Sequence, residues 1–514
     1  MRFFAFDTGQ YPTGGVTGVE QTKTPIFDAV KRYIETGTIP FHVPGHKQGR
    51  GLPELAAYAG ERVLEMDLTC MPGLDNICNP RDAIAEAEAL AAKTFGADRA
   101  FFLVNGTTSG IQAMIMAVCH PGDKLIIPRN AHKSAVGGII MSGANPVYIE
   151  PEIDTDFGIS MGVSPEQVER AILQHPDAKA VFVINPNYYG TASDLSAIVE
   201  VAHRHGIPVI VDEAHGAHLA FSDELPLSAM ESGADLAASS THKLVGSMTQ
   251  SSMLLLKEGL VSAERVKGVL NLTQTTSPSY LLLTSLDLAR KQIALHGKEL
   301  VSNTLELARW VKNELKTVEG IQLFGEGLAG RPGCHAFDPT KIILNVTGLG
   351  MSGYEVEHLL REEHRLQVEL SDLYNVMFVI TLGDTRETVQ YLVNCIKSIS
   401  KCNPLKNVVK YCPPLPEIPN MMVLPRDAFY SETKLVPLAE AAGEISAESI
   451  MAYPPGIPLI CPGEIITQSV IDYVNILKQE QADLQGTEDK RINNIKVLKN
   501  AVAITKSEVR EDVV

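Results

Sequence analysis

A lysine and an aspartate that lie near each other in this sequence could do chemistry as a pair. Lys243 lies in the stretch S-S-T-H-K-L-V-G-S, residues 239–247, and Asp212 ends the apolar run V-I-V-D. A lysine amine can form a Schiff base with an aldehyde, and a carboxylate can keep a pyridine nitrogen protonated so that its ring accepts electrons. A carboxylate at the end of a buried strand also needs a cationic partner, which a pyridinium supplies. The pair predicts pyridoxal phosphate (PLP) chemistry, whereas Lys243 alone would be an ordinary surface lysine.

Small hydroxyl residues could hold the phosphate of such a cofactor. The segment G-T-T-S-G, residues 106–110, joins a predicted strand to a predicted helix and contains Thr107, Thr108 and Ser109. Unpaired amides and the helix dipole both favour an anion at a helix N-terminus. The same residue types also form plain helix caps, so this segment predicts a phosphate site only together with Lys243.

Other polar side chains occur beside the same predicted strands. Ser240 and His242 flank Lys243 and could reach a phosphate, and His215 follows Asp212 in V-D-E-A-H-G. His132, in R-N-A-H-K-S, could stack on a planar ring, although a histidine at a loop edge often has a purely local role. We therefore treat these four residues as candidates that depend on the fold.

The elements that must position these residues alternate between strand and helix. Such alternation predicts an α/β fold with a doubly wound, mostly parallel sheet, in which ligands bind at the carboxyl ends of the strands. The predicted strands lie at 100–105, 124–129, 146–150, 179–185, 207–213, 236–241 and 252–257, and the predicted helices at 111–118, 132–141, 165–174 and 194–205.

The rest of the chain suggests further units. Helices are expected at 24–35, 82–95, 278–318 and 467–480, turn-rich loops at 39–51 and 67–81, an α+β pattern at 341–400, and a stiff proline-rich linker at 413–419. We predict an N-terminal arm with loops over 1–66, a cofactor-binding major domain over 67–330, a small α+β domain over 331–412 and a C-terminal segment over 413–514.

Composition narrows the possible functions. The 514 residues carry a net charge of −17, which argues against nucleic acid as a partner and would suit a cationic small molecule. Eight cysteines are scattered without a C-x-x-C pair, so we expect reduced thiols and no metal site. No apolar run is long enough to cross a bilayer and the N-terminus does not resemble a signal peptide, so we expect a cytoplasmic protein.

Ten motifs between Thr22 and Glu464 carry a resemblance to a known family. They are T-K-T-P-I-F-D-A, F-H-V-P-G-H-K-Q-G, D-L-T-C-M-P-G-L-D-N, N-G-T-T-S-G, N-A-H-K-S, N-Y-Y-G-T-A-S-D-L, V-D-E-A-H-G-A-H, S-S-T-H-K, Q-T-T-S-P-S-Y and A-Y-P-P-G-I-P-L-I-C-P-G-E. In order and content the chain closely resembles the Orn/Lys/Arg decarboxylases, which are PLP enzymes of fold type I. It is similar to the shorter members, which lack an extra N-terminal receiver-like wing.

The resemblance implies a role for each candidate. Lys243 would carry the cofactor, Asp212 would pair with its pyridine nitrogen, and His132 would stack over the ring. The phosphate would bind Thr108 and Ser109, with Ser240 and His242 alongside, while His215 would lie near the ring. The 452–464 segment would shape the substrate pocket, and Glu464 would be the candidate partner for the distal cation of the substrate. The family also implies a homodimer or higher homo-oligomer with sites at the subunit interface.

The expected reaction is α-decarboxylation of a basic amino acid. The resemblance favours arginine, which would give agmatine for polyamine synthesis, with lysine or ornithine as alternatives. One departure is Asn187 in P-N-Y-Y-G, where the family pattern has threonine. Two other classes stay open, namely an aminotransferase, which would need an arginine such as Arg129 or Arg81 on the α-carboxylate, and a non-catalytic binding paralogue.

Overall fold

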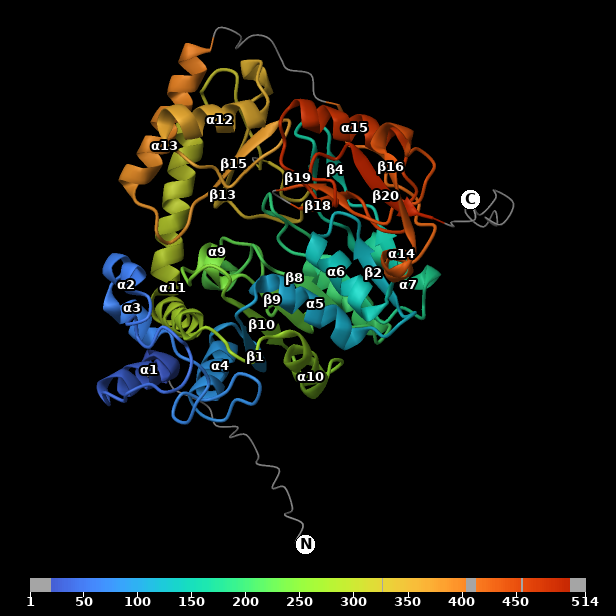
Figure 1. Cartoon of the computed structure of the whole chain (residues 1–514). Helices are drawn as coiled ribbons and strands as arrows, with labels where there is room; N and C mark the ends of the chain where they lie inside the picture. The colour runs from blue at the N-terminus through green and yellow to red at the C-terminus, as the bar shows by residue number, and fades with distance from the viewer. Residues whose placement is uncertain (1–19, 326, 404–412, 454–455, 500–514) are drawn as a thin grey trace.

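The computed structural model describes residues 20–325, 327–403, 413–453 and 456–499 (Figure 1). Parts of all four predicted units, and two prolines of the 452–464 segment, lie outside these residues. The predicted domain boundaries after residues 66, 330 and 412 stay predictions. Within the described residues, no helix combines the length and the apolar character that crossing a membrane would need.

A seven-stranded sheet forms the centre of the molecule, in the order β1-β10-β9-β8-β6-β2-β3. Strands β9, β8, β6, β2 and β3 are parallel, whereas β10 pairs antiparallel with both β1 and β9. The bounds are β1 Arg99–Leu103, β2 Lys124–Pro128, β3 Asn145–Ile149, β6 Ala180–Ile184, β8 Val209–Asp212, β9 Leu236–Ser239 and β10 Ser252–Leu256. The prediction of a mostly parallel sheet is confirmed.

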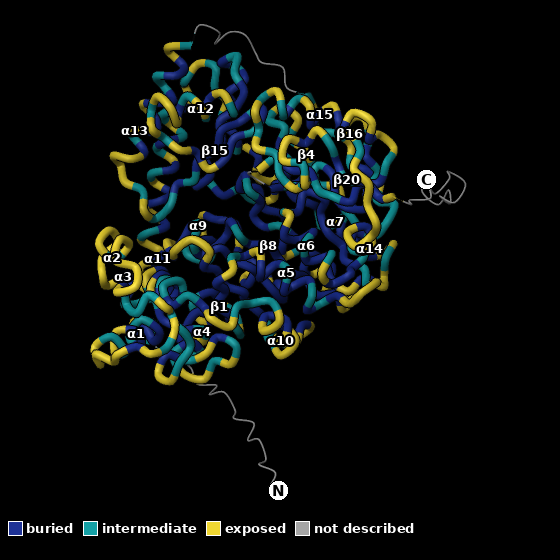
Figure 2. Tube along the Cα trace, in the orientation of Figure 1, coloured by how far each residue is buried: buried dark blue, intermediate teal, exposed yellow. Residues whose placement is uncertain are grey.

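Helices cover both faces of this sheet because the side chains of each strand alternate between two buried cores. Phe102, for example, belongs to one core and Phe101 to the other. One face packs on α5, α6 and α10, and the other on α1, α4, α7, α8 and the first part of α11. Figures 1 and 2 label all of these helices except α8. The bounds are α1 Pro25–Glu35, α4 Ala83–Thr94, α5 Gly106–Val118, α6 Lys133–Ser142, α7 Pro165–Gln174, α8 Leu195–Arg204, α10 Ala263–Thr273 and α11 Tyr280–Leu315.

A smaller antiparallel sheet, in the order β11-β13-β15-β14, packs against α12, α13 and the end of α11. Helix α11 therefore enters two cores, since Leu283 belongs to the core of the large sheet and Val311 to that of the small one. The bounds are β11 Gln322–Leu323, β13 Lys341–Asn345, α12 Gly353–His364, β14 Leu370–Ser371, β15 Asn375–Val379 and α13 Arg386–Cys402.

The C-terminal part has its own core beneath α15, which Figure 1 shows in red. Its strands form two small antiparallel sheets that the sequence analysis did not predict. The bounds are α14 Pro425–Tyr430, β16 Thr433–Pro437, β17 Ile450–Ala452, β18 Ile457–Ile460, α15 Gln468–Gln479, β19 Leu484–Gln485 and β20 Asn494–Leu498. Two short helices, α2 Pro53–Ala59 and α3 Glu61–Met66, also went unpredicted, whereas 39–51 is a loop as expected.

Candidate active site

A cavity of about 320 Å³ lies where the strands of the large sheet end. It brings together eight of the ten residues singled out from the sequence. They are Thr107, Thr108, His132, Asp212, His215, Ser240, His242 and Lys243. Their strand-end positions explain the convergence, because loops after neighbouring parallel strands meet at one edge of a sheet.

Lys243 lies on the single-turn helix α9, Thr241–Leu244, which follows β9 directly. Its Nζ is 2.8 Å from Nε2 of His215 and 5.0 Å from the centre of the Tyr188 ring. Burial lowers the pKa of Lys243, and Asp212 and Glu369 only partly oppose this shift. A lysine that gives up its proton more easily offers the free amine that attacks an aldehyde.

Asp212 ends β8 and forms the buried floor of the cavity. Its Oδ1 accepts a hydrogen bond of 3.1 Å from the backbone N–H of Ala214, and Oδ2 has no hydrogen-bond partner among the described residues. Burial raises the pKa of Asp212, while the Ala214 N–H and the charge of Lys243 lower it. A free carboxylate oxygen at this depth suits a protonated pyridine nitrogen, which would supply the missing charge.

His132 precedes α6 and holds a neutral ring in the cavity wall. Its Nδ1 accepts the backbone N–H of Ser134 at 3.2 Å, which leaves the ring proton on Nε2. Burial lowers the pKa of His132 to about 4, and the charges of Lys243 and Lys133 add to the effect. A Cβ on Gly456 would lie 3.1 Å from the imidazole, so a loop of the C-terminal part closes over this histidine.

The first turn of α5 has the donor set that an anion needs. Asn105, at the N-cap position, makes no side-chain capping bond, and Gly106 has φ +72° with open space where a Cβ would stand. The Thr107 hydroxyl contacts the Ser240 hydroxyl, and His242 Nδ1 is 2.8 Å from the Ser251 carbonyl. Uncapped amides, two hydroxyls and an imidazole fit the phosphate of PLP.

The two remaining sequence candidates lie elsewhere. Ser109 is buried within α5 and donates its hydroxyl to the Gly106 carbonyl at 2.8 Å. The Glu464 carboxylate is held by Arg129, whose Nε and Nη2 donate to it at 3.0 and 2.8 Å. Neither residue lines the cavity, so we do not carry forward the predicted role of Glu464 as substrate partner.

The cavity also contains residues that the sequence analysis did not select. The centre of the Tyr188 ring lies 4.2 Å from that of His215, with the two rings tilted by 47°, and the motif of Tyr188 was noticed only for the neighbouring Asn187. The Asn187 side chain accepts the Thr191 N–H and donates to the Ser160 carbonyl, so it fixes the turn that presents Tyr188. Glu369 enters from the small domain, and nothing local in the sequence indicated this approach.

The sequence model described as "Orn/Lys/Arg decarboxylase, major domain" matches residues 24–388, and the one described as its "C-terminal domain" matches residues 415–494. The chain belongs to this family. The members of the family and the structural neighbours of the chain are PLP-dependent enzymes. Because it belongs to this family, the chain is a PLP-dependent amino-acid decarboxylase. Membership of this family also decides against the aminotransferase alternative. That alternative would have needed an arginine such as Arg129 on the α-carboxylate of the substrate, and Arg129 is already bound to Glu464.

Similar proteins cover nearly the whole of this decarboxylase. The chain is 47% identical to an arginine decarboxylase of Bacillus subtilis, over 95% of this chain and all of that protein. It is 46% identical to an arginine decarboxylase of Bacillus anthracis, over 94% and 98% of the two chains. Among solved structures, the constitutive lysine decarboxylase of Escherichia coli superposes with a TM-score of 0.78 at 20% identity, covering 94% of this chain and 82% of that one. That likeness establishes fold type I.

Proposed function

We propose that this decarboxylase converts arginine to agmatine and carbon dioxide with PLP held at Lys243, as a step in polyamine synthesis. The observation that carries the proposal is one cavity that joins Lys243, Asp212 and His132 to the uncapped first turn of α5. Arginine is favoured because the two relatives above are arginine decarboxylases at 46–47% identity. We further propose a cytoplasmic homodimer or higher homo-oligomer.

Each residue of the cavity has a task in this scheme. PLP, when bound, accepts the electron pair of the Cα–carboxylate bond as carbon dioxide leaves. Asp212 would hold a proton on the pyridine nitrogen, and His132 would pack its neutral ring against the cofactor. The α5 amides would bind the phosphate, with the side chains of Thr107, Thr108, Ser240 and His242 around it.

The loss of carbon dioxide must be balanced by a proton delivered to Cα. Lys243 and His132 both line the cavity. Burial lowers the pKa of both, that of His132 to about 4, so little of the charged imidazolium that could give a proton is present at neutral pH. Lys243 is the stronger candidate, because a lysine whose pKa is lowered can both give and take a proton beside the cofactor that it would hold. His215, 2.8 Å from Lys243 Nζ, can position that amine.

Product identification tests the proposal. Purified protein with PLP and an equimolar mixture of arginine, lysine and ornithine is analysed by mass spectrometry, with Lys243→Ala as the control. Agmatine as the main product, and neither amine nor the visible absorbance of the lysine-bound cofactor in the variant, is expected. Cadaverine or putrescine would keep the mechanism and overturn the substrate, whereas normal turnover by Lys243→Ala would contradict the role of the lysine.

A further inference from the structure

A basic amino acid brings a second cation into the cavity, in its side chain. A cation that loses water on binding needs an opposite charge close by, or binding becomes unfavourable. The site described so far provides partners for the cofactor only. One of the residues around the cavity must therefore face the guanidinium of arginine or the ammonium of a shorter substrate.

Around the inner cavity, where a substrate attached near Lys243 begins, charge leaves one candidate. Asp212 and Glu369 are the only carboxylates among the described residues that line the cavity. Asp212 lies on the floor, bonded to the Ala214 N–H and suited to the pyridine nitrogen. Glu464 is bound to Arg129 through two hydrogen bonds and to the Cys461 N–H through a third. We propose that Glu369 is the counter-charge for the distal cation of the substrate, an inference that rests on the proposed function.

The position of Glu369 fits this role. Its backbone N–H donates to the Met377 carbonyl at 3.0 Å, which ties the residue to β15. Its carboxylate has neither a hydrogen-bond nor an ion-pair partner within the described part of the chain. An unpaired carboxylate on a firmly anchored backbone is ready for a ligand cation and need not first break an internal contact.

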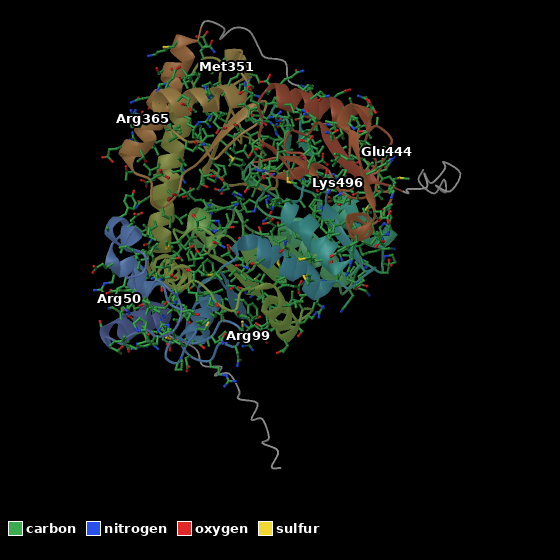
Figure 3. All side chains as sticks on the ribbon, in the orientation of Figure 1. Arg50, Arg99, Met351, Arg365, Glu444 and Lys496 are labelled. Carbon is green, nitrogen blue, oxygen red and sulfur yellow. The ribbon has the colours of Figure 1, made fainter. Side chains whose placement is uncertain are left out.

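Glu369 also lies where two cavities meet. It lines the inner cavity and an outer one of about 970 Å³ between α9 and the small domain, and Lys243, His215 and His242 are shared in the same way. A substrate attached near Lys243 can therefore extend its side chain past Glu369 into the outer space. Two further acids, Asp384 and Glu387, line that space. Arg365, which Figure 3 labels on the small domain, lines it as well.

Neighbouring cations do not neutralise the charge of Glu369. Lys341 is fully buried and its Nζ donates to Asp338 at 2.7 Å, so it already has a partner. Lys243 contacts His215, and its amine would have to be uncharged to attack the aldehyde of the cofactor. Both lysines lower the pKa of Glu369 against the burial that raises it, and a substrate cation would stabilise the carboxylate further.

The test compares wild type with Glu369→Gln and with the control Glu363→Gln, all purified with PLP. Glu363 is exposed on α12, so the control makes the same charge change on the same domain outside both cavities. Two quantities are measured on each protein, the KM for arginine and the inhibition constant of citrulline. Citrulline has the length of arginine but carries a neutral urea in place of the guanidinium.

We expect Glu369→Gln to raise the KM for arginine about fivefold, because Glu369 is exposed before the substrate binds and solvent weakens the attraction of such a charge for a cation. Inhibition by citrulline should stay within about twofold of wild type, and the control should leave both values unchanged. A variant that keeps the wild-type preference for arginine over citrulline would overturn the proposal. A fall in kcat with an unchanged KM would also overturn it, since Glu369 would then act through Lys243.

Failure of the proposed function would be visible separately. Wild-type protein that produces no agmatine from arginine contradicts that function before any variant is compared. Binding of arginine and citrulline can then be followed by the change each causes in the visible absorbance of the cofactor. Loss of the advantage of arginine in Glu369→Gln would still support the assignment of Glu369, and its persistence would refute it.

Discussion

Burial dominates the ionisation of the residues around Lys243. It raises the pKa of Asp212 and lowers the pKa values of Lys243, His132 and His215, so all four are shifted toward their neutral forms. Such a site has few fixed charges until the cofactor brings its pyridinium and phosphate. The residues are therefore complementary to PLP and not to one another, which explains why Asp212 keeps an oxygen free.

The pH dependence of substrate binding follows from the same cause. Burial raises the pKa of Glu369, and Lys243 and Lys341 oppose the shift without cancelling it. The carboxylate therefore becomes protonated at a higher pH than an ordinary glutamate, and its attraction for the guanidinium is lost as the pH falls through that range. We expect the KM for arginine to increase toward acid pH, measured by initial rates at fixed ionic strength.

Glu369→Gln is the control for this pH effect. Its KM should be high already at neutral pH and should change little toward acid, because arginine itself stays charged throughout. A wild-type KM that is flat across the same pH range would contradict the prediction.

At this scale the sequence predicted the cofactor side of the site better than the substrate side. Lys243, Asp212 and the α5 turn are recognisable because each ends a strand or begins a helix, and these positions follow from local periodicity. Glu369 follows α12 on another domain, and its approach to Lys243 depends on tertiary packing. Glu464 was chosen from a motif, but the motif could not reveal that Arg129 already binds it.

Among the elements, the first turn of α5 depends on one glycine. Gly106 has φ +72°, where a side chain costs about 1–2 kcal/mol, yet a Cβ there meets open space. Gly106→Ala should therefore fold but tilt the amides that face the phosphate. We expect the dissociation constant for PLP to rise about tenfold, since 1–2 kcal/mol corresponds to roughly this factor. Titration of the cofactor-free protein with PLP, followed by absorbance, measures it.

Gly268→Ala provides the matched control. Gly268 lies in α10, with no positive φ and open space around a Cβ, so alanine should leave PLP affinity unchanged and stabilise the helix by about 0.5–1 kcal/mol. Equal PLP affinities in the two variants would show that the conformation of Gly106 does not matter for the cofactor.

Element types were predictable wherever a regular period exists. Seven strands of the large sheet and most of the helices on its faces agree with the predictions, whereas α10 was not predicted. The antiparallel direction of β10 was not predictable, because direction depends on how the chain returns and not on the residues of the strand. The short strands of the C-terminal part were missed for a different reason, since they do not alternate regularly with helices as the strands of the large sheet do.

In the molecule as a whole, a buried ion pair joins the C-terminal part to the large sheet. Arg129 follows β2, Glu464 follows β18, and both are almost fully buried. Arg129→Met would leave the Glu464 carboxylate uncompensated, which typically costs about 3–5 kcal/mol. We expect a clearly lower temperature of thermal unfolding, measured by calorimetry on the full chain.

The double variant Arg129→Met with Glu464→Leu separates charge from packing. Replacing both partners removes the uncompensated charge, so its unfolding temperature should lie above that of Arg129→Met alone. If the single variant unfolds at the wild-type temperature, the pair does not hold the two parts together.

Helix α11 belongs to the core of the large sheet near its start and to the core of the small sheet near its end. Each residue of a helix advances about 1.5 Å and turns about 100°. Inserting or deleting one residue midway would therefore rotate the small domain away from Lys243 and carry Glu369 with it. The number of residues between Tyr280 and Leu315 should thus be fixed by selection, and alignment gaps among relatives should fall in the surface loops on either side of this helix.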